Sequence, residues 1–147
     1  MKRIIVSGYF NPLHGGHLNL IEAAREKGDH LIVVVNNDDQ QMLKKGKIIL
    51  DEANRVRLVS ALRQVDEVVV SIDDTPGQAK TLNMIANKYP DDELLFCQGG
   101  DYGSLDALPP DEAAVCKAKR ITVLFGVGDT EKYDSSTRIN QALGLQD

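Results

Sequence analysis

The stretch G-Y-F-N-P-L-H-G-G-H-L-N-L, from Gly8 to Leu20, decides the fold of this chain. It follows the apolar run 4–6 and leads into the amphipathic segment 18–27, which predicts a strand, a tight turn and a helix in that order. The turn places His14 and His17 three residues apart, where the first helical turn begins. A helix N-terminus attracts phosphate through its N–H groups and dipole, and two imidazoles at the same edge add hydrogen-bond donors.

Length and composition indicate one globular domain. The chain has 147 residues, of which 42% are hydrophobic and 27% charged, enough to bury a core. The formal charge of −5 argues against nucleic acid as a partner, although a few local cations can still hold a nucleotide. Cys97 and Cys116 match neither a metal site nor a disulfide framework, so we expect both to be reduced and partly buried. Without a signal peptide or a membrane-spanning segment, the sequence favours a cytoplasmic protein.

Apolar and amphipathic segments alternate along the chain, which predicts an α/β fold: a Rossmann-like, doubly wound parallel sheet of five strands in one domain, residues 1–147. We expect strands at residues 3–7, 31–35, 68–70, 94–97 and 121–125. We expect helices at residues 16–27, 51–63, 75–89, 109–118 and 136–143, and a polar loop at 36–50.

Polar segments follow four of the expected strands, at residues 8–17, 36–47, 99–102 and 126–137. In open parallel sheets, ligands bind beyond the carboxyl ends of the strands. Because these ends meet at the same edge of the sheet, the four segments are expected to line one site.

The pattern H-x-G-H at 14–17, after G-x-F-x-P at 8–12, resembles the signature of the cytidylyltransferase-like nucleotidyltransferases. The resemblance covers nearly the whole chain and includes features of glycerol-3-phosphate cytidylyltransferases and of heptose-1-phosphate adenylyltransferases. It implies that a substrate phosphate attacks the α-phosphorus of a nucleoside triphosphate directly, so that pyrophosphate leaves. By the same resemblance His14 and His17 contact the triphosphate and stabilise the transition state; helix capping and packing are the alternative roles for such a pair.

The segment N-N-D-D-Q-Q-M-L-K-K-G-K, residues 36–47, resembles the acidic-then-basic loop of the family. This resemblance assigns Lys44 as the cation that bridges the acceptor phosphate and the nucleotide, with Asp38 at the acidic position. Gly46 stands where glycerol-phosphate members carry a second basic residue, with Lys45 and Lys47 on either side. The acceptor is therefore left open.

Arg55, in D-E-A-N-R-V-R-L, matches a family arginine that holds the acceptor phosphate. The alternative is a surface ion pair with Asp51 or Glu52, worth under about 1 kcal/mol. Both roles stay open on the sequence alone.

The resemblance also assigns nucleotide contacts to three segments. Asp101, in Q-G-G-D-Y at 98–102, offers a carboxylate suited to ribose hydroxyls. The run D-S-S-T-R-I at 134–139 would hold the β and γ phosphates, a role compatible with an ordinary helix N-cap. The expected nucleotide-binding residues are Gly8, Tyr9, Phe10, Asn11, Gly16, Asp101, Ser135, Ser136 and Thr137.

The sequence thus predicts an enzyme that takes a nucleoside triphosphate, CTP or ATP, and a phosphorylated small molecule. Mg²⁺ is expected to bind mainly through the nucleotide phosphates, with no protein ligands assigned to it. Neither nucleic acid nor a membrane is an expected partner, and family analogy suggests a homodimer. The alternative function is a non-catalytic, regulatory nucleotide-binding module.

Overall fold

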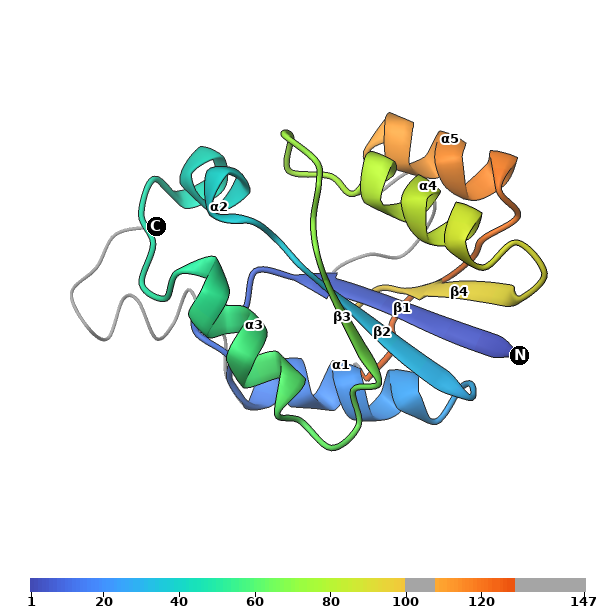
Figure 1. Cartoon of the computed structure of the whole chain (residues 1–147), viewed down its shortest axis with the longest axis horizontal. Coiled ribbons are helices and arrows are strands. Elements are labelled where there is room, and N and C mark those ends of the chain that lie inside the picture. The colour runs from blue at the N-terminus through green and yellow to red at the C-terminus, as the bar shows by residue number, and fades with distance from the viewer. Residues whose placement is uncertain (100–107, 129–147) are drawn as a thin grey trace.

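The computed structural model describes residues 1–99 and 108–128, and these form a parallel five-stranded sheet covered by helices (Figure 1). The strands lie in the order β3-β2-β1-β4-β5, so the chain changes direction of winding between β1 and β4. The predicted α/β, Rossmann-like, doubly wound fold is confirmed. The strands are β1 (Lys2–Gly8), β2 (His30–Val35), β3 (Glu67–Val70), β4 (Glu93–Cys97) and β5 (Thr122–Leu124).

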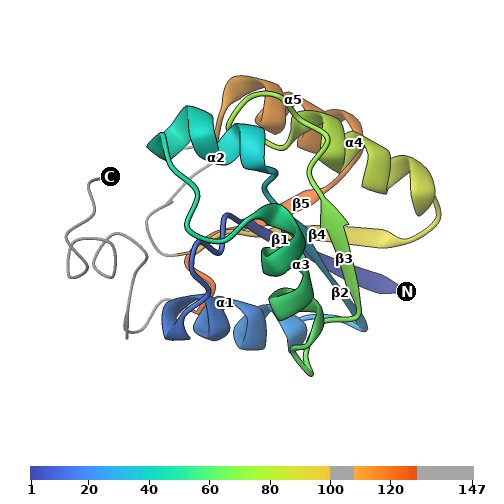
Figure 2. The ribbon, with the colours of Figure 1, turned by 60° about the vertical axis from the view of Figure 1, so that its left-hand side comes forward.

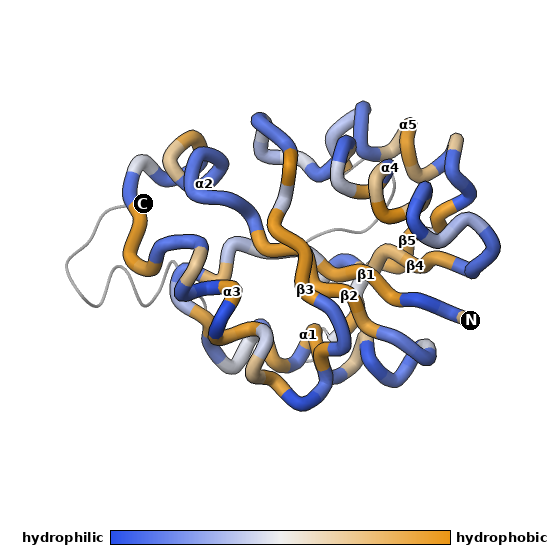
Figure 3. The backbone as a smooth tube through the Cα atoms, in the orientation of Figure 1, coloured by the Kyte–Doolittle hydropathy of each residue, from blue (hydrophilic) through white to orange (hydrophobic). Residues whose placement is uncertain are grey.

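Helices cover both faces of the sheet (Figures 1 and 2). Alternate side chains of the central strands pack in two separate cores, one with α1 (Gly15–Arg25) and α3 (Glu52–Ser60), the other with α4 (Ala79–Lys88) and α5 (Pro110–Ala118). Figure 3 shows these strands as apolar segments between hydrophilic turns. The residues 31–35 are all fully buried because the strand is covered on both sides.

The segment predicted as a polar loop contains a further helix, α2 (Asp38–Lys45), so that prediction is wrong. Asn37 begins the helix: its side-chain oxygen accepts from the Gln40 N–H at 2.8 Å, and Gln40 Oε1 accepts from the Asn37 N–H at 3.0 Å. Gly46 ends it in the left-handed conformation, with φ of +72°. Acidic residues in the first turn and lysines in the last turn also suit the helix dipole.

Helix α4 begins at Ala79, four residues later than predicted from the Thr75-Pro76 pair. The Asp73 carboxylate accepts from the N–H groups of Lys80 at 2.8 Å and Thr81 at 2.9 Å, and so caps the helix from the loop that precedes it. The other described elements lie close to their predicted positions. The predicted helix at 136–143 lies outside the described residues.

Both cysteines are free and buried, as expected, and burial raises the pKa of each thiol to about 11. Within residues 1–99 and 108–128, no helix combines the length and the apolar character needed to cross a membrane.

Candidate functional site

The two histidines of the turn after β1 together cap helix α1. His14 Nδ1 accepts from the Gly16 N–H at 3.0 Å, and His17 Nδ1 accepts from the His14 N–H at 3.2 Å. The two rings stack with their centroids 3.8 Å apart. A ring nitrogen that accepts an N–H carries no proton, so each neutral imidazole has its proton on Nε2. The arrangement therefore fixes both tautomers as Nε2–H donors at the N-terminus of a helix.

His17 is uncharged at physiological pH. Burial is the main cause that lowers its pKa from 6.5 to about 3, and the neighbouring His14 lowers this pKa further. The ring of Phe10 contacts it edge-on, with the centroids 4.8 Å apart. His17 can therefore donate a hydrogen bond to a phosphate, while positive charge must come from other groups.

Gly8 and Phe10 shape the turn behind the histidines. Phe10 is 1% exposed and has a φ of +53°, and it packs in the core beside α1. A Cβ at Gly8 would lie 2.9 Å from the Phe10 ring, which explains the glycine at the end of β1. Both residues were predicted to bind nucleotide; the structure places the Phe10 side chain under the turn, in contact with His17.

Lys44 lies in the last turn of α2, and its ammonium group is 4.6 Å from the centroid of the Tyr9 ring. This cation–π contact joins α2 to the turn after β1, so the predicted cation lies beside the predicted nucleotide turn. Partial burial is the main cause that lowers the pKa of Lys44, and the charge of Lys45 contributes. A lysine held in this way is a point charge beside the turn that the sequence predicts to bind phosphate.

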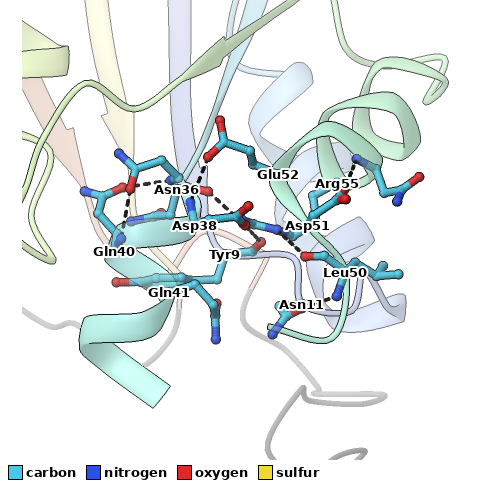
Figure 4. Close-up of polar contacts among 12 residues, drawn as sticks. Tyr9, Asn11, Asn36, Asp38, Gln40, Gln41, Leu50, Asp51, Glu52 and Arg55 are labelled. Carbon is cyan, nitrogen blue, oxygen red and sulfur yellow. Dashed lines mark hydrogen bonds and ion pairs between the residues drawn. The ribbon is translucent and has the colours of Figure 1, made fainter. Parts of the chain in front are cut away.

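Arg55 is fully buried, and Figure 4 shows it among the residues around the start of α2 and α3. Four of its five N–H bonds donate within the protein, and the fourth acceptor is the carboxylate of Asp38, at 2.7 Å. The three backbone acceptors are the carbonyl oxygens of Leu50 at 2.9 Å, Tyr9 at 2.8 Å and Asn36 at 2.6 Å.

These contacts exclude one of the two roles left open for Arg55, a surface ion pair with Asp51 or Glu52. Asp51 instead caps α3 through the Asn54 N–H, and Glu52 accepts from the Asp38 N–H at 3.0 Å. Arg55 joins the turn after β1, the end of β2, the start of α2 and the approach to α3. Direct contact with an acceptor phosphate stays a prediction, because the guanidinium is occupied with holding these four segments together.

Two buried amide side chains, those of Asn11 and Gln41, hold the segment before α3. Asn11 Oδ1 accepts from the N–H groups of Ile49 at 3.0 Å and Leu50 at 2.8 Å. Gln41, which was not singled out, donates from Nε2 to the Lys47 carbonyl at 3.2 Å. Asn11 therefore connects the turn after β1 with the chain beyond α2.

The remaining predicted residues divide into two groups. Gly16 contributes its backbone N–H to the histidine cap. Asp101, Ser135, Ser136 and Thr137 lie outside the described residues. In residues 1–99 and 108–128, no three His, Cys, Asp or Glu side chains are grouped so as to hold a metal ion.

Comparisons with known proteins identify relatives of this chain. The sequence matches the family described as cytidylyltransferase-like over residues 5–141. It is 34% identical over 123 residues to the bifunctional protein HldE of Nitrosococcus oceani, covering 82% of this chain and 24% of that protein. It is 39% identical over 103 residues to HldE of Histophilus somni, covering 69% of this chain and 20% of that protein. The chain thus spans about a quarter or less of these curated relatives.

A solved structure shares the same architecture. The lipopolysaccharide core biosynthesis protein of Thermoplasma volcanium superposes with a TM-score of 0.65 at 26% sequence identity. The superposition covers 91% of this chain and 99% of that one. This chain therefore shares its fold with that solved structure.

Proposed function

Because this chain belongs to the cytidylyltransferase-like family, we propose that it is a nucleotidyltransferase that joins a nucleoside triphosphate to a phosphorylated sugar or polyol. An oxygen of the acceptor phosphate attacks the α-phosphorus, and a new phosphorus–oxygen bond forms. The bond from the α-phosphorus to the oxygen that bridges to the β-phosphorus breaks, and pyrophosphate leaves. No covalent enzyme intermediate is needed, so the protein supplies position and charge stabilisation.

The observation that carries this proposal is the histidine pair with both Nδ1 atoms occupied by backbone N–H groups. Two neutral Nε2–H donors at the start of α1 suit the negative charge that develops on the phosphorus oxygens in the transition state. The backbone N–H groups and dipole of α1 add to the same potential.

Lys44 is the cation proposed for the acceptor side. Two phosphates repel each other when they approach, and an ammonium group between them reduces this repulsion. The contact of Lys44 with Tyr9 supports this role, because it holds the charge next to the turn that carries the histidines.

Magnesium is proposed to enter as part of the substrate, bound to the triphosphate oxygens. The described residues contain no cluster that would hold the ion by itself, and Asp38 already accepts from Arg55. Mg²⁺ prefers phosphate oxygens and water, so a triphosphate complex needs few protein ligands.

For the acceptor, resemblance favours a sugar phosphate. The S-I-D-D-T-P run at 71–76 and the G-G-D-Y run at 99–102 are similar to those of heptose-1-phosphate adenylyltransferases. The solved structure from Thermoplasma volcanium is described as a lipopolysaccharide core biosynthesis protein, which also points to sugar chemistry. These likenesses favour ATP and a sugar 1-phosphate over CTP and glycerol 3-phosphate.

Pyrophosphate release tests the proposal. ATP, CTP, GTP and UTP with magnesium are each combined with glycerol 3-phosphate, hexose 1-phosphates, heptose 1-phosphates and phosphocholine. We expect release with one triphosphate and a sugar or polyol phosphate. Triphosphate binding without release from any pair would favour the non-catalytic module, and absence of triphosphate binding would refute both functions.

A further inference from the structure

Several buried amide groups at the carboxyl edge of the sheet have no hydrogen-bond partner. Among the described residues these include Nδ2 of Asn36, a donor, and Oε1 of Gln78, an acceptor. The two residues are only 2% and 3% exposed. Because an unpaired buried polar group destabilises a fold, such groups at a binding edge indicate a ligand that pairs with them.

Asn36 lies directly after β2 on the α4 side of the sheet. Its backbone N–H donates to the Gly8 carbonyl at 2.9 Å, which continues the pairing of β2 with β1. Val35 belongs to the core beside α1 and α3, and side chains alternate along a strand. The Asn36 side chain therefore belongs to the opposite face, where α4 and α5 pack.

Gln78 lies on the same side, directly before α4. The carbonyl of its neighbour Gly77 accepts from Gln40 Nε2 at 3.2 Å, so this turn packs against the first turns of α2. Thr81, three residues after Gln78, lies within 3.2 Å of the Ser71 hydroxyl at the end of β3. Asn36 and Gln78 thus both lie on the α4 side of the carboxyl edge, one at the end of β2 and the other at the start of α4, and we call this region the corner beside α4.

A third polar group closes this corner. Glu112 of α5 is 5% exposed, and a Cβ at Gly77 would lie 3.2 Å from its Oε2 atom. Burial is the main cause that raises the pKa of Glu112 to about 7, although a hydrogen bond with the Gln78 backbone opposes the shift. Near neutral pH this carboxyl group can therefore either donate or accept.

The donors and acceptors of this corner distinguish between ligand groups. A fully ionised phosphate accepts hydrogen bonds but donates none, so it leaves Gln78 Oε1 unpaired. A hydroxyl group both donates and accepts, and so it can pair with Gln78 and with Asn36.

We propose that Asn36 and Gln78 form a hydroxyl-binding subsite that selects polyhydroxylated acceptor phosphates. This inference rests on the proposed function and names the residues that would select the acceptor. Lys44 holds the acceptor phosphate, while sugar hydroxyls reach the corner beside α4, donate to Gln78 Oε1 and accept from Asn36 Nδ2. An acceptor without hydroxyl groups, such as phosphocholine, leaves both amides unpaired and is rejected.

Calorimetric binding to the whole chain tests the subsite without requiring turnover. The variant Gln78→Met removes both polar atoms and keeps the length of the side chain. Gln64→Met is the matched control, because Gln64 lies between α3 and β3, at the opposite edge of the sheet. The ligands are hexose 1-phosphates, heptose 1-phosphates, glycerol 3-phosphate, phosphocholine and magnesium–ATP.

We expect a sugar phosphate to bind the unaltered protein, and Gln78→Met to weaken this binding about 10-fold or more. The affinity of Gln78→Met for magnesium–ATP is expected to stay within about 2-fold of that of the unaltered protein. The affinity of Gln64→Met for every ligand is expected to stay within the same range. If Gln78→Met does not fold, Asn36→Asp takes its place, since it removes the donor at nearly constant volume and is expected to weaken the same ligand.

Three results would overturn the subsite: sugar-phosphate binding that ignores both substitutions, equal weakening of ATP and sugar phosphate, or no binding of any hydroxylated phosphate. The proposed function fails separately. Sugar-phosphate binding that depends on Gln78, without pyrophosphate release, would refute nucleotidyl transfer and retain the subsite. Pyrophosphate release with unchanged acceptor affinity in the variants would retain the transfer and refute the subsite.

Discussion

Replacing Arg55 by methionine is expected to destabilise the fold by about 4 kcal/mol, since breaking a buried ion pair costs about 3–5 kcal/mol. The Arg55 side chain is fully buried, and its removal leaves three carbonyl oxygens and the Asp38 carboxylate without their donor. The Asp38 side chain is 29% exposed, so water recovers part of the loss. A loss of this size is a large share of the roughly 5–15 kcal/mol that stabilises a typical domain.

Equilibrium unfolding in urea, followed by circular dichroism, measures this loss. The matched control is Arg57→Met, because Arg57 lies on the same helix with its side chain exposed, where a substitution changes stability by about 0.5 kcal/mol or less. Arg55→Lys keeps the charge without the planar donors and is expected to fall between the two. If Arg55→Met is as stable as Arg57→Met but binds the acceptor poorly, Arg55 is a substrate ligand and the positioning argument is refuted.

Three further outcomes are expected. His17→Ala should lower kcat/KM by a factor that corresponds to a loss of about 2–4 kcal/mol of transition-state stabilisation. Steady-state kinetics measures this loss, with His30→Ala, at the start of β2, as the control variant. An unchanged rate in a folded His17→Ala variant would contradict the mechanism. Because its pKa is about 3, the His17 ring should show no NMR titration between pH 5 and 8, whereas an inflection near 6.5 would mean that the ring is solvated. Burial raises the pKa of Glu112 from 4.5 to about 7, so the unfolded chain loses this proton first as the pH rises. Stability should then decline by about 3 kcal/mol from pH 4.5 to above 7, and Glu112→Gln should remove the decline in urea titrations at pH 5 and 8; equal pH dependence in both proteins would refute the assignment.

Local patterns predicted the sheet and the histidine turn because their signals lie within short stretches of sequence. Five apolar residues in a row identify β2, and glycines beside the H-x-G-H pattern identify the turn. The sequence also contains the signals that predict helix α2. The N-x-x-Q pattern at Asn37 and Gln40 is a capping box, and Gly46 ends the helix. The polar composition of the segment favoured a loop instead, because it shows little of the apolar periodicity expected of a helix.

Other features depend on contacts between distant segments, and no local pattern contains them. Asp73 caps α4 from seven residues away, which moves the start of the helix beyond the Thr-Pro pair. Its own helix leaves Arg55 open to a phosphate contact or a surface ion pair, and its burial depends on acceptors that the turn after β1 and the end of β2 supply. Whether the amides of Asn36 and Gln78 are buried and unpaired likewise depends on tertiary packing, which the local sequence does not contain.

The histidine cap has a consequence for the role of protons in the proposed transfer. A ring that takes up a second proton at Nδ1 can no longer accept from the backbone, so protonation of His14 or His17 would open the first turn of α1. The stability that neutral His17 contributes is complete above pH 6.5 and is lost as the pH falls toward 3. Protonation of His17 at low pH is therefore expected to destabilise the start of α1. In the proposed transfer a general base would gain and lose a proton in every cycle, whereas the uncharged His17 ring keeps its Nε2 proton and acts as a hydrogen-bond donor.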